Sequence, residues 1–327
     1  MNSTSKTGKL YVVGLGPGNE GGMTIRARRI LDECRIIVGY KTYIDLVKSI
    51  LNAYITDINS DSSSYPDKTV TYNINCEDSK RNIPDINDII GNEDNTDNAG
   101  SKDKVTVSSD NGNDSIYKGI GISAKVKKYI ETGMRQEAER CRLALGTASD
   151  AGEPVCMVCS GDSGIYGMAG IILELAPKYP DVEVEVIPGV TAALSGSALL
   201  GAAVGHDCAI ISLSDLLTPA EVIEKRLRAA AEGDFVLCLY NPASRTRTDH
   251  LKRACEILLS YKDKDTVCGC VRNIGRDGES ISVMTLDELK DVQADMFTTV
   301  FIGNSMTKNI DGYMVTPRGY KTADSPS

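Results

Sequence analysis

The chain has 327 residues, a formal net charge of −9, 41% hydrophobic and 25% charged residues, which is the composition of a globular protein of about two domains. No apolar run reaches the roughly 18 residues of a membrane span, the start MNSTSKTGK is unlike a signal peptide, and no basic stripe suits nucleic acid, so we expect neither a membrane nor a nucleic-acid partner. Ten cysteines without the spacing of a disulfide framework predict free thiols in the cytoplasm.

Most of the negative charge belongs to one segment. Residues 57–115 hold thirteen acidic and five basic side chains, which leaves 32 acidic and 31 basic side chains elsewhere. The stretch 56–119 also contains ten asparagines and few large apolar groups, too few to offset the entropy of ordering it. We therefore predict a low-complexity, disordered or loosely ordered insertion at about 57–119. Its composition favours a solvated loop over a regulatory or partner-binding role.

The first elements alternate between strand and helix. Residues 10–13 (LYVV) predict a buried strand, followed by the loop GLGPG at 14–18. Asn19 stands where a dinucleotide-binding fingerprint needs a third glycine, and Pro17 lacks an N–H to face a phosphate, so NAD and FAD are disfavoured. A helix capped by Thr24 should follow, with an apolar face of Ala27, Ile30, Leu31 and Cys34.

Residues 36–39 predict a second strand. The four residues after it, 40–43 (YKTY), either line a cleft with polar tips or start a helix. Beyond the acidic segment, ordered chain resumes near Ile122. The next helix should bury Met134, Ala138, Cys141 and Leu145.

The central stretch 155–170 (VCMVCSGDSGIYGMAG) pairs a strand, 155–159, with a helix whose apolar positions are Met168, Ile171, Ile172 and Leu175. Between them, Gly161 and Asp162 mark a turn at the carboxyl end of the strand, where open α/β sheets bind ligands. The glycines of this stretch are expected to let a flat ligand approach the backbone, and Asp162 suits an amine or ribose hydroxyls. An ordinary strand–helix loop explains the pattern equally well.

The second half repeats the strand–helix rhythm. Valines at 182, 184 and 186 alternate with glutamates, as in a strand, and the small residues of 189–203 predict a helix packed very close to a neighbour or ligand. Residues 218–221 (TPAE) and 285–288 (TLDE) predict capping boxes. Strands are predicted at 208–213, 235–240, 266–271 and, as the last one, 298–303, with a helix at Leu251, Ala254, Cys255 and Leu258. We expect an N-terminal α/β domain over 1–193, a C-terminal α/β domain over 194–320 and a frayed tail over 321–327.

Four blocks carry a resemblance to the tetrapyrrole methyltransferases that build cobalamin: GLGPG, GDSGIYGMAG at 161–170, VIPGVTAA at 186–193 and FIGNS at 301–305. Within that family, GYKTYIDL at 39–46, ISLSDLLTP at 211–219, LYNPASRTR at 239–247 and VRNIGRDGES at 271–280 resemble the precorrin-3B carbon-17 methyltransferase branch. The resemblance covers residues 9–320 except the insertion. It implies the two-domain tetrapyrrole methylase fold (class III S-adenosylmethionine methyltransferase) with the cofactor in a cleft between the domains, and a homodimer.

The resemblance also implies the roles of individual residues. S-adenosylmethionine would be contacted by Pro17, Gly161, Asp162, Ile165, Thr191 and Ala192, and on its adenine side by Leu239, Asn241, Gly303 and Asn304. The implied reaction is methyl transfer to carbon 17 of a precorrin-3B or cobalt-precorrin-3 macrocycle with ring contraction to precorrin-4. Contraction needs proton movement, for which Asp215, Arg272, Lys41 and Thr191 are the catalytic candidates.

The anionic substrate calls for local cations. Arg245, Arg247, Arg272, Arg276 and Lys308 are expected in loops after strands of the second domain, at the edge that borders the site. We expect no metal site: Cys156 with Cys159 and Cys268 with Cys270 lie in apolar strands and are interpreted as buried thiols.

Several alternatives stay open. The chief one is a precorrin methyltransferase that acts on another ring carbon, followed by an RNA or protein methylase of similar fold, which the missing basic face disfavours. A non-catalytic tetrapyrrole carrier is the non-enzymatic alternative. The sequence leaves open whether the substrate holds cobalt.

Overall fold

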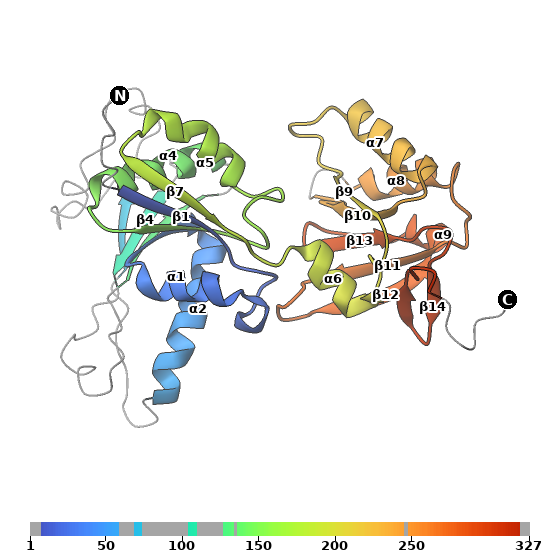
Figure 1. Cartoon of the computed structure of the whole chain (residues 1–327), viewed down its shortest axis with the longest axis horizontal. Helices are drawn as coiled ribbons and strands as arrows, with labels where there is room; N and C mark the ends of the chain where they lie inside the picture. Colours follow the sequence, from blue (N-terminus) through green and yellow to red (C-terminus); the bar gives the residue numbers. More distant parts are fainter. Residues whose placement is uncertain are drawn as a thin grey trace. The chain divides into compact units, whose positions relative to one another are not determined.

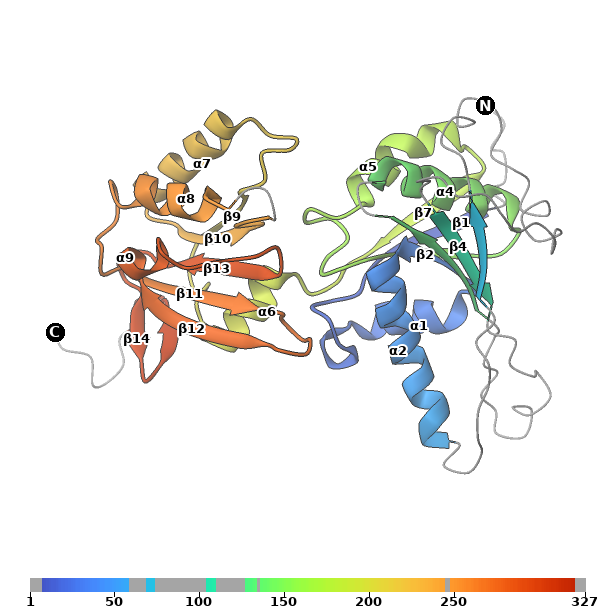
Figure 2. The ribbon, with the colours of Figure 1, turned by 180° about the vertical axis from the view of Figure 1, so that it is seen from behind.

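The computed structural model describes residues 8–58, 69–73, 104–109, 127–133, 136–244 and 248–320. The chain divides into two compact units, Met1–Val190 and Thr191–Ser327, called the first and second unit below (Figures 1 and 2). Each unit combines α-helices with a β-sheet, so the predicted α/β class is confirmed. The boundary between residues 193 and 194 stays a prediction. Within the described residues, no helix is both long and apolar enough to span a membrane.

The first unit is built on a seven-stranded sheet in the order β3-β4-β5-β2-β6-β1-β7. Its strands are β1 (Gly8–Gly14), β2 (Ile36–Tyr40), β3 (Thr69–Asn73), β4 (Lys104–Ser109), β5 (Lys128–Thr132), β6 (Val155–Cys159) and β7 (Val182–Ile187). The strands β5, β2, β6, β1 and β7 all pair in parallel, and β3 and β4 join them antiparallel. The five parallel strands therefore end at one edge of the sheet.

Helices cover both faces of this sheet. α1 (Ile25–Glu33) and α2 (Lys41–Ile58) lie on one face, and α4 (Glu137–Asp150) and α5 (Ala169–Leu175) on the other (Figures 1 and 2). Alternate residues of β6 serve the two cores: Cys156 packs on the α1 side and Met157 on the α4 side, and both are fully buried. A strand buried on both faces reads as an unbroken apolar run, which is why residues 155–159 were predictable.

The insertion contains two strands that the sequence did not predict. Residues 69–73 (β3) and 104–109 (β4) pair antiparallel with each other, and β4 pairs with β5. The expectation of an unstructured segment is therefore wrong for these two stretches. Backbone pairing to an existing sheet edge explains them, because main-chain hydrogen bonds need no apolar side chain. Residues 57–58 of the predicted insertion belong to the end of a helix that starts at Lys41. The other residues of the predicted insertion, and Ile122 and Met134, lie outside the described residues.

The second unit has a five-stranded sheet in the order β12-β11-β13-β10-β9 and a small sheet β14-β15-β8. The bounds are β8 (Gly201–Ala202), β9 (Cys208–Ser212), β10 (Val236–Tyr240), β11 (Val267–Arg272), β12 (Ser280–Thr285), β13 (Thr298–Ile302), β14 (Lys308–Ile310) and β15 (Tyr313–Val315). β13 runs antiparallel to both of its neighbours, β10 and β11. The sequence missed β12, and 298–303 is not the last strand, since β14 and β15 follow.

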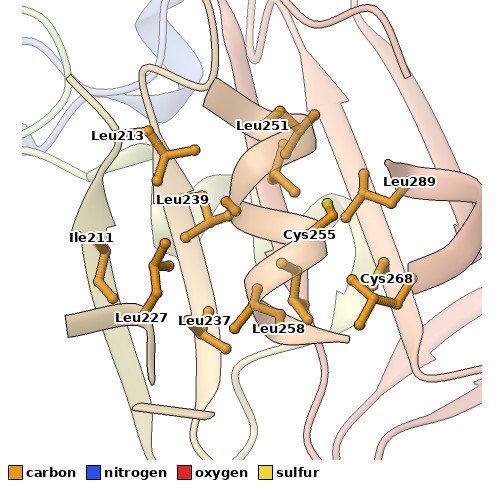
Figure 3. Close-up of a cluster of buried hydrophobic side chains, with 14 of the residues drawn as sticks. Ile211, Leu213, Leu227, Leu237, Leu239, Leu251, Cys255, Leu258, Cys268 and Leu289 are labelled. Carbon is orange, nitrogen blue, oxygen red and sulfur yellow. The ribbon is translucent and has the colours of Figure 1, made fainter. Parts of the chain in front are cut away.

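The core of the second unit lies under α7 (Ala220–Glu232), α8 (His250–Leu258) and α9 (Leu286–Leu289). Figure 3 shows Leu251, Cys255 and Leu258 of α8 in one cluster with Leu237 and Leu239 of β10 and Leu289 of α9. The four positions predicted to be the apolar face of α8 are all buried.

The other face of this sheet carries α6 (Ala192–Leu200). A Cβ atom on Gly196 would lie 2.7 Å from the ring of Phe301, so the predicted close approach of this helix to a neighbour is confirmed.

Helix ends follow the predicted caps in two of three places. The Thr24 hydroxyl accepts from the Ala27 N–H, and Thr285 with Glu288 forms the capping box of α9. The box predicted at 218–221 is wrong. Helix α7 starts at Ala220 with Pro219 as its N-cap residue and no side-chain cap, so the Thr218 hydroxyl stands one position too early to cap it.

Candidate functional site

The carboxyl edge of the parallel strands gathers the candidate residues of the first unit. Gly14 of β1 is level with Cys159 of β6, and Tyr40 of β2 is level with Thr132 of β5. The turn at 160–163, which follows β6, therefore lies beside the GLGPG loop, as expected for a ligand-binding edge.

Two backbone hydrogen bonds join these loops. The Gly16 N–H donates to the Gly161 carbonyl at 3.0 Å, and the Gly161 N–H returns a bond to the Gly16 carbonyl at 2.8 Å. Both residues have positive φ angles, +79° and +63°, which glycine adopts without strain. The loop that carries Pro17 is thereby fixed to the turn that carries Asp162.

Asp162 organises the turn through its carboxylate. Its Oδ1 accepts from the N–H groups of Gly164 (2.8 Å) and Ile165 (3.0 Å), and its Oδ2 accepts from Gly189 N–H (3.0 Å) in the loop after β7. A carboxylate oxygen offers two lone pairs, so Oδ2 can accept a further bond from an amine or a hydroxyl. The side chain thus fits the proposed role and also holds three backbone donors in place.

The glycines serve loop packing more than ligand access. A Cβ atom on Gly189 would lie 2.1 Å from the Gly161 carbonyl oxygen, and one on Gly14 would lie 2.6 Å from the Gly189 nitrogen. A Cβ atom on Gly167 would lie 2.2 Å from the Ser163 oxygen. The expectation that these glycines leave room for a flat ligand is wrong at Gly167, because protein backbone fills that space. At Gly170 the space is open.

The tip of the turn is strained and exposed. Tyr166 has φ +53°, a left-handed conformation that costs a bulky residue energy, and its side chain is 54% exposed next to Ile165 at 38%. Strained residues cluster at functional sites. Sequence reasoning missed Tyr166, although Gly164 and Gly167 around it are a usable signal of irregular backbone.

Lys41 is the first residue of α2, so residues 41–43 start a helix, as one of the two interpretations of residues 40–43 predicted. The cleft-lining interpretation stays a prediction. Its Nζ lies 3.5 Å from Glu131 Oε2 and 3.7 Å from Asp45 Oδ1. Glu131, whose other oxygen pairs with Lys48, raises the pKa of Lys41, as does Asp45. Lys41 therefore stays protonated near neutral pH, which suits binding an anion and not abstracting a proton.

In the second unit, Tyr240 at the end of β10 connects to the start of α6. Its hydroxyl lies 2.6 Å from Thr191 Oγ1 and accepts from the Ala193 N–H at 2.8 Å. Thr191 is buried and does not cap α6 with its own side chain, so Tyr240 supplies the cap. Thr191 and Ala192 are thus close to the carboxyl end of β10. The sequence did not predict the role of Tyr240.

Asn241 follows β10 with φ +52°, and its Nδ2 donates to Ser212 Oγ at 3.0 Å. The side chain of Leu239 is buried in the core shown in Figure 3, so only its backbone is available to a ligand. Asp215 lies in the loop after β9. Its Oδ2 is 3.5 Å from Nε2 of His250, so these two side chains are neighbours at this edge.

The predicted cations lie at different places. Arg272 ends β11, and its Nε lies 2.7 Å from Asp295 Oδ2. Although burial opposes ionisation of Asp295, hydrogen bonds from Arg272, Thr298 and the Phe297 N–H hold the pKa of that carboxyl below its usual value. Arg276 lies in the loop that follows β11, and Arg245 and Arg247 lie outside the described residues.

Gly303 and Asn304, which follow β13, lie at the opposite edge of the five-stranded sheet from Asn241. Because β13 is antiparallel to β10 and β11, its end meets their starts: Gly303 N–H donates to the Val267 carbonyl. One strand length, roughly 15 Å at about 3.3 Å per residue, separates the two edges. Lys308 belongs to β14 and not to a loop at the site edge, which corrects that expectation.

The cysteine pairs are structural. Cys156, Cys159, Cys268 and Cys270 are buried free thiols, and burial raises the pKa of Cys159 to about 11 and that of Cys270 to about 12. Such thiols stay protonated and are poor metal ligands at neutral pH. Across the part of the chain that the structure describes, no group of three or more His, Cys, Asp and Glu side chains is placed to hold a metal ion.

Comparisons with known proteins agree with this architecture. The family model of the Tetrapyrrole (Corrin/Porphyrin) Methylases matches residues 9–290. A Salmonella typhimurium protein named probable cobalt-factor III C(17)-methyltransferase is 38% identical over 312 residues, which are 95% of this chain and 99% of that relative.

Solved structures share the fold. The methyltransferase CobJ aligns with a TM-score of 0.66 and 28% identity, over 95% of this chain and 100% of that chain. A uroporphyrin-III C-methyl transferase from Thermus thermophilus, complexed with S-adenyl homocysteine, aligns with a TM-score of 0.54 and 19% identity, over 90% of this chain and 97% of that chain. These matches confirm the expected tetrapyrrole methylase fold. With a family model that covers most of its length, this chain belongs to the tetrapyrrole (corrin/porphyrin) methylases.

Proposed function

We propose that the protein transfers a methyl group from S-adenosylmethionine to carbon 17 of cobalt-factor III, or of its metal-free counterpart precorrin-3B, with ring contraction to the precorrin-4 level in cobalamin biosynthesis. The observation that carries this proposal is the 38% identity, over almost the whole length of both chains, to the Salmonella protein named for that reaction. The likeness to CobJ supports it.

The cofactor proposal is supported by the chemistry of the first unit. S-adenosylmethionine, when bound, supplies an electrophilic methyl group on a sulfonium. The carboxylate of Asp162, fixed by three N–H groups, suits an amine or ribose hydroxyl, and the joined loops at Gly16 and Gly161 keep it in place. The solved relative complexed with S-adenyl homocysteine gives the proposal further support. The proposed set of contacts is completed by Pro17, Ile165, Thr191, Ala192, Leu239 and Asn241. Gly303 and Asn304 are not included, because they lie a strand length away from Asn241.

Positioning is the main contribution we assign to the protein in the methyl transfer. A direct displacement needs alignment and exclusion of water more than a strong base. For ring contraction we propose that the Asp215–His250 pair holds and moves a proton, since His250 Nε2 lies 3.5 Å from Asp215 Oδ2 and an imidazole can both accept and donate a proton. Lys41, Arg272 and Thr191 remain the other catalytic candidates.

We also propose that Arg245, Arg247, Arg272 and Arg276 bind carboxylates of the macrocycle, that the protein acts as a homodimer, and that it works in the cytoplasm. The nine cysteines that the structure describes are free thiols, which supports a reducing compartment. No nucleic-acid or membrane partner is proposed.

Incubation with ¹³C-methyl-labelled S-adenosylmethionine tests the function. With cobalt-factor III or precorrin-3B, we expect the product to gain one methyl group, with the label on carbon 17 in NMR spectra and an absorption change that marks contraction. Comparing the two substrates shows which form is used.

Other outcomes would point to the alternatives. Label on another carbon would contradict the proposed position and favour a related precorrin methyltransferase. Calorimetry with S-adenosylhomocysteine separates enzyme from carrier: binding of the macrocycle without binding of this compound would favour a non-catalytic tetrapyrrole carrier.

A further inference from the structure

Arg140 of α4 is a buried cation whose charge is not paired by a carboxylate. It is 5% exposed, and in the described part of the chain no acidic side chain lies within ion-pair distance of its guanidinium. Its contacts are neutral: Nε donates to Thr132 Oγ1 at 2.5 Å, Nη2 donates to the Gly133 carbonyl at 2.8 Å, and Nη1 lies 4.0 Å from Met168 Sδ. The guanidinium carbon also lies 5.8 Å from the centre of the Tyr40 ring.

Two of its five N–H groups therefore donate to nothing in the described residues. Burying a charge is costly unless an opposite charge and further hydrogen bonds compensate it. Most buried arginines meet this need with an aspartate or glutamate. Glu131 is the nearest acidic residue in sequence, but its carboxylate lies on the α2 side with Lys41 and Lys48, whereas Arg140 comes from α4 on the opposite face.

The position of Arg140 is the second observation. Thr132 ends β5 and Gly133 follows it, Tyr40 ends β2, and Met168 follows the turn that Asp162 organises after β6. These are three neighbouring strands of the first sheet, and all three end at the edge where we propose that ligands bind. The guanidinium lies where these three strand ends meet.

We infer that Arg140 binds a carboxylate of a ligand at this edge, through the N–H groups that the protein leaves unused. A carboxylate fits because it accepts two parallel bonds from one guanidinium and cancels the buried charge. The inference rests on the proposed function, which supplies two sources of this group: the amino-acid end of S-adenosylmethionine and the acetate and propionate side chains of the macrocycle.

Isothermal titration of Arg140→Gln and Arg140→Lys identifies the source. The cofactor arm compares S-adenosylhomocysteine with 5′-methylthioadenosine, which keeps the nucleoside and lacks the carboxylate. The macrocycle arm uses cobalt-factor III. Loss of a charged hydrogen-bond pair should weaken binding about tenfold to a hundredfold for the ligand whose carboxylate Arg140 holds, and should leave methylthioadenosine binding unchanged.

Arg142→Gln is the matched control, because Arg142 lies on the same helix, is exposed and pairs with Glu139. Thermal unfolding checks that each variant is folded, and Arg140→Lys keeps the charge if the glutamine variant does not fold. Unchanged affinity of Arg140→Gln for both carboxylate ligands would overturn the inference. Equal losses for S-adenosylhomocysteine and methylthioadenosine, with no loss for cobalt-factor III, would overturn it too. Absence of any binding to the wild type would instead contradict the proposed function.

Discussion

At the scale of single residues, buried polar side chains in this protein are defined by the backbone groups they hold. Lys127, just before β5, is buried, and its Nζ donates to the carbonyls of Leu31, Asp32 and Cys34, each at 2.7 Å. These carbonyls lie at the end of α1, where helical partners are missing. One lysine therefore caps α1 and connects it to β5, although the two are far apart in sequence.

Replacing Lys127 with methionine should destabilise the protein by roughly 2–4 kcal/mol, because the change leaves three carbonyl groups without their charged donor. Urea denaturation measures the free energy of unfolding. Lys128→Met is the control, since the Lys128 side chain makes no such bond within the described residues. Equal losses for both variants would contradict the capping role.

In the candidate site too, the roles of Asp162 and Arg140 depend on the hydrogen bonds that they make within the fold. From the sequence alone, Asp162 was interpreted as a ligand contact, and Arg140 was not singled out. In the structure, Asp162 first satisfies three N–H groups, while Arg140 keeps unused donors. The two roles, holding the backbone in place and binding a ligand, differ in how many of the side chain's donors and acceptors already bond to the protein. This number depends on residues that are distant in sequence.

At the scale of elements, α6 shows why its small residues matter. Glycine within a helix normally costs about 1 kcal/mol relative to alanine. At Gly196, however, an added Cβ atom would lie 2.7 Å from the ring of Phe301 and 3.2 Å from Ile274. Phe301 is fully buried. The close contact of α6 with β13 is possible only because Gly196 lacks a side chain.

Gly196→Ala should therefore destabilise the protein, by about 1–2 kcal/mol, because overpacking a rigid core outweighs the gain in helix propensity. Gly170→Ala in α5 is the matched control: nothing lies within 4 Å of its added Cβ, so it should be neutral or stabilising. Thermal unfolding compares the two. Stabilisation by Gly196→Ala would show that Phe301 moves aside.

The direction of β13 decides which candidate residues meet. The predicted strand 298–303 was correct within a residue, but its antiparallel pairing carries Gly303 and Asn304 away from Asn241. Apolar periodicity reports that a strand exists and is buried. It does not report in which direction the strand runs, because side chains alternate in the same way in both.

At the scale of the whole molecule, two carboxyls make the second unit sensitive to acid. Hydrogen bonds from Ser305 and the charge of Lys262 outweigh burial and lower the pKa of Asp234, and those from Arg272 and Thr298 do the same for Asp295. A carboxyl whose pKa is lower in the folded state stabilises the fold above its unfolded pKa. This stability is lost as the pH falls through the folded value.

The melting temperature of the second unit should therefore fall as the pH drops below about 4, the pKa of an unperturbed aspartate. The fall should be smaller in an Asp234→Asn, Asp295→Asn double variant, which is already less stable at neutral pH. Calorimetry across pH measures this, and separate transitions would show the units unfolding independently. Asp265→Asn serves as the control, because its carboxyl makes no ion pair in the described residues. A double variant with the pH dependence of the wild type would contradict the assignment.

Much of the fold was accessible from the sequence because it depends on local signals. The buried runs at 10–13, 36–39 and 155–159, the Thr24 and Thr285 caps and the apolar face of α8 each depend on residues within a turn or two of one another. The family followed from four motifs in order. The sequence missed the strands β3, β4, β5, β8, β12, β14 and β15, since polar, short or edge strands gain their stability from pairing and not from an apolar pattern.

The sequence by itself determined the α/β class, the main strands and helices and the family. Only the tertiary structure decided that Tyr240 caps α6 and that Lys127 caps α1. It also decided that Gly303 lies a strand length from Asn241, and that Arg140 is buried with two N–H groups that have no acceptor in the described residues. The physical reason is the distance in sequence over which each interaction acts. Periodicity and capping act between neighbours in the chain, whereas strand direction, burial and hydrogen-bond satisfaction arise between segments that meet only when the chain has folded.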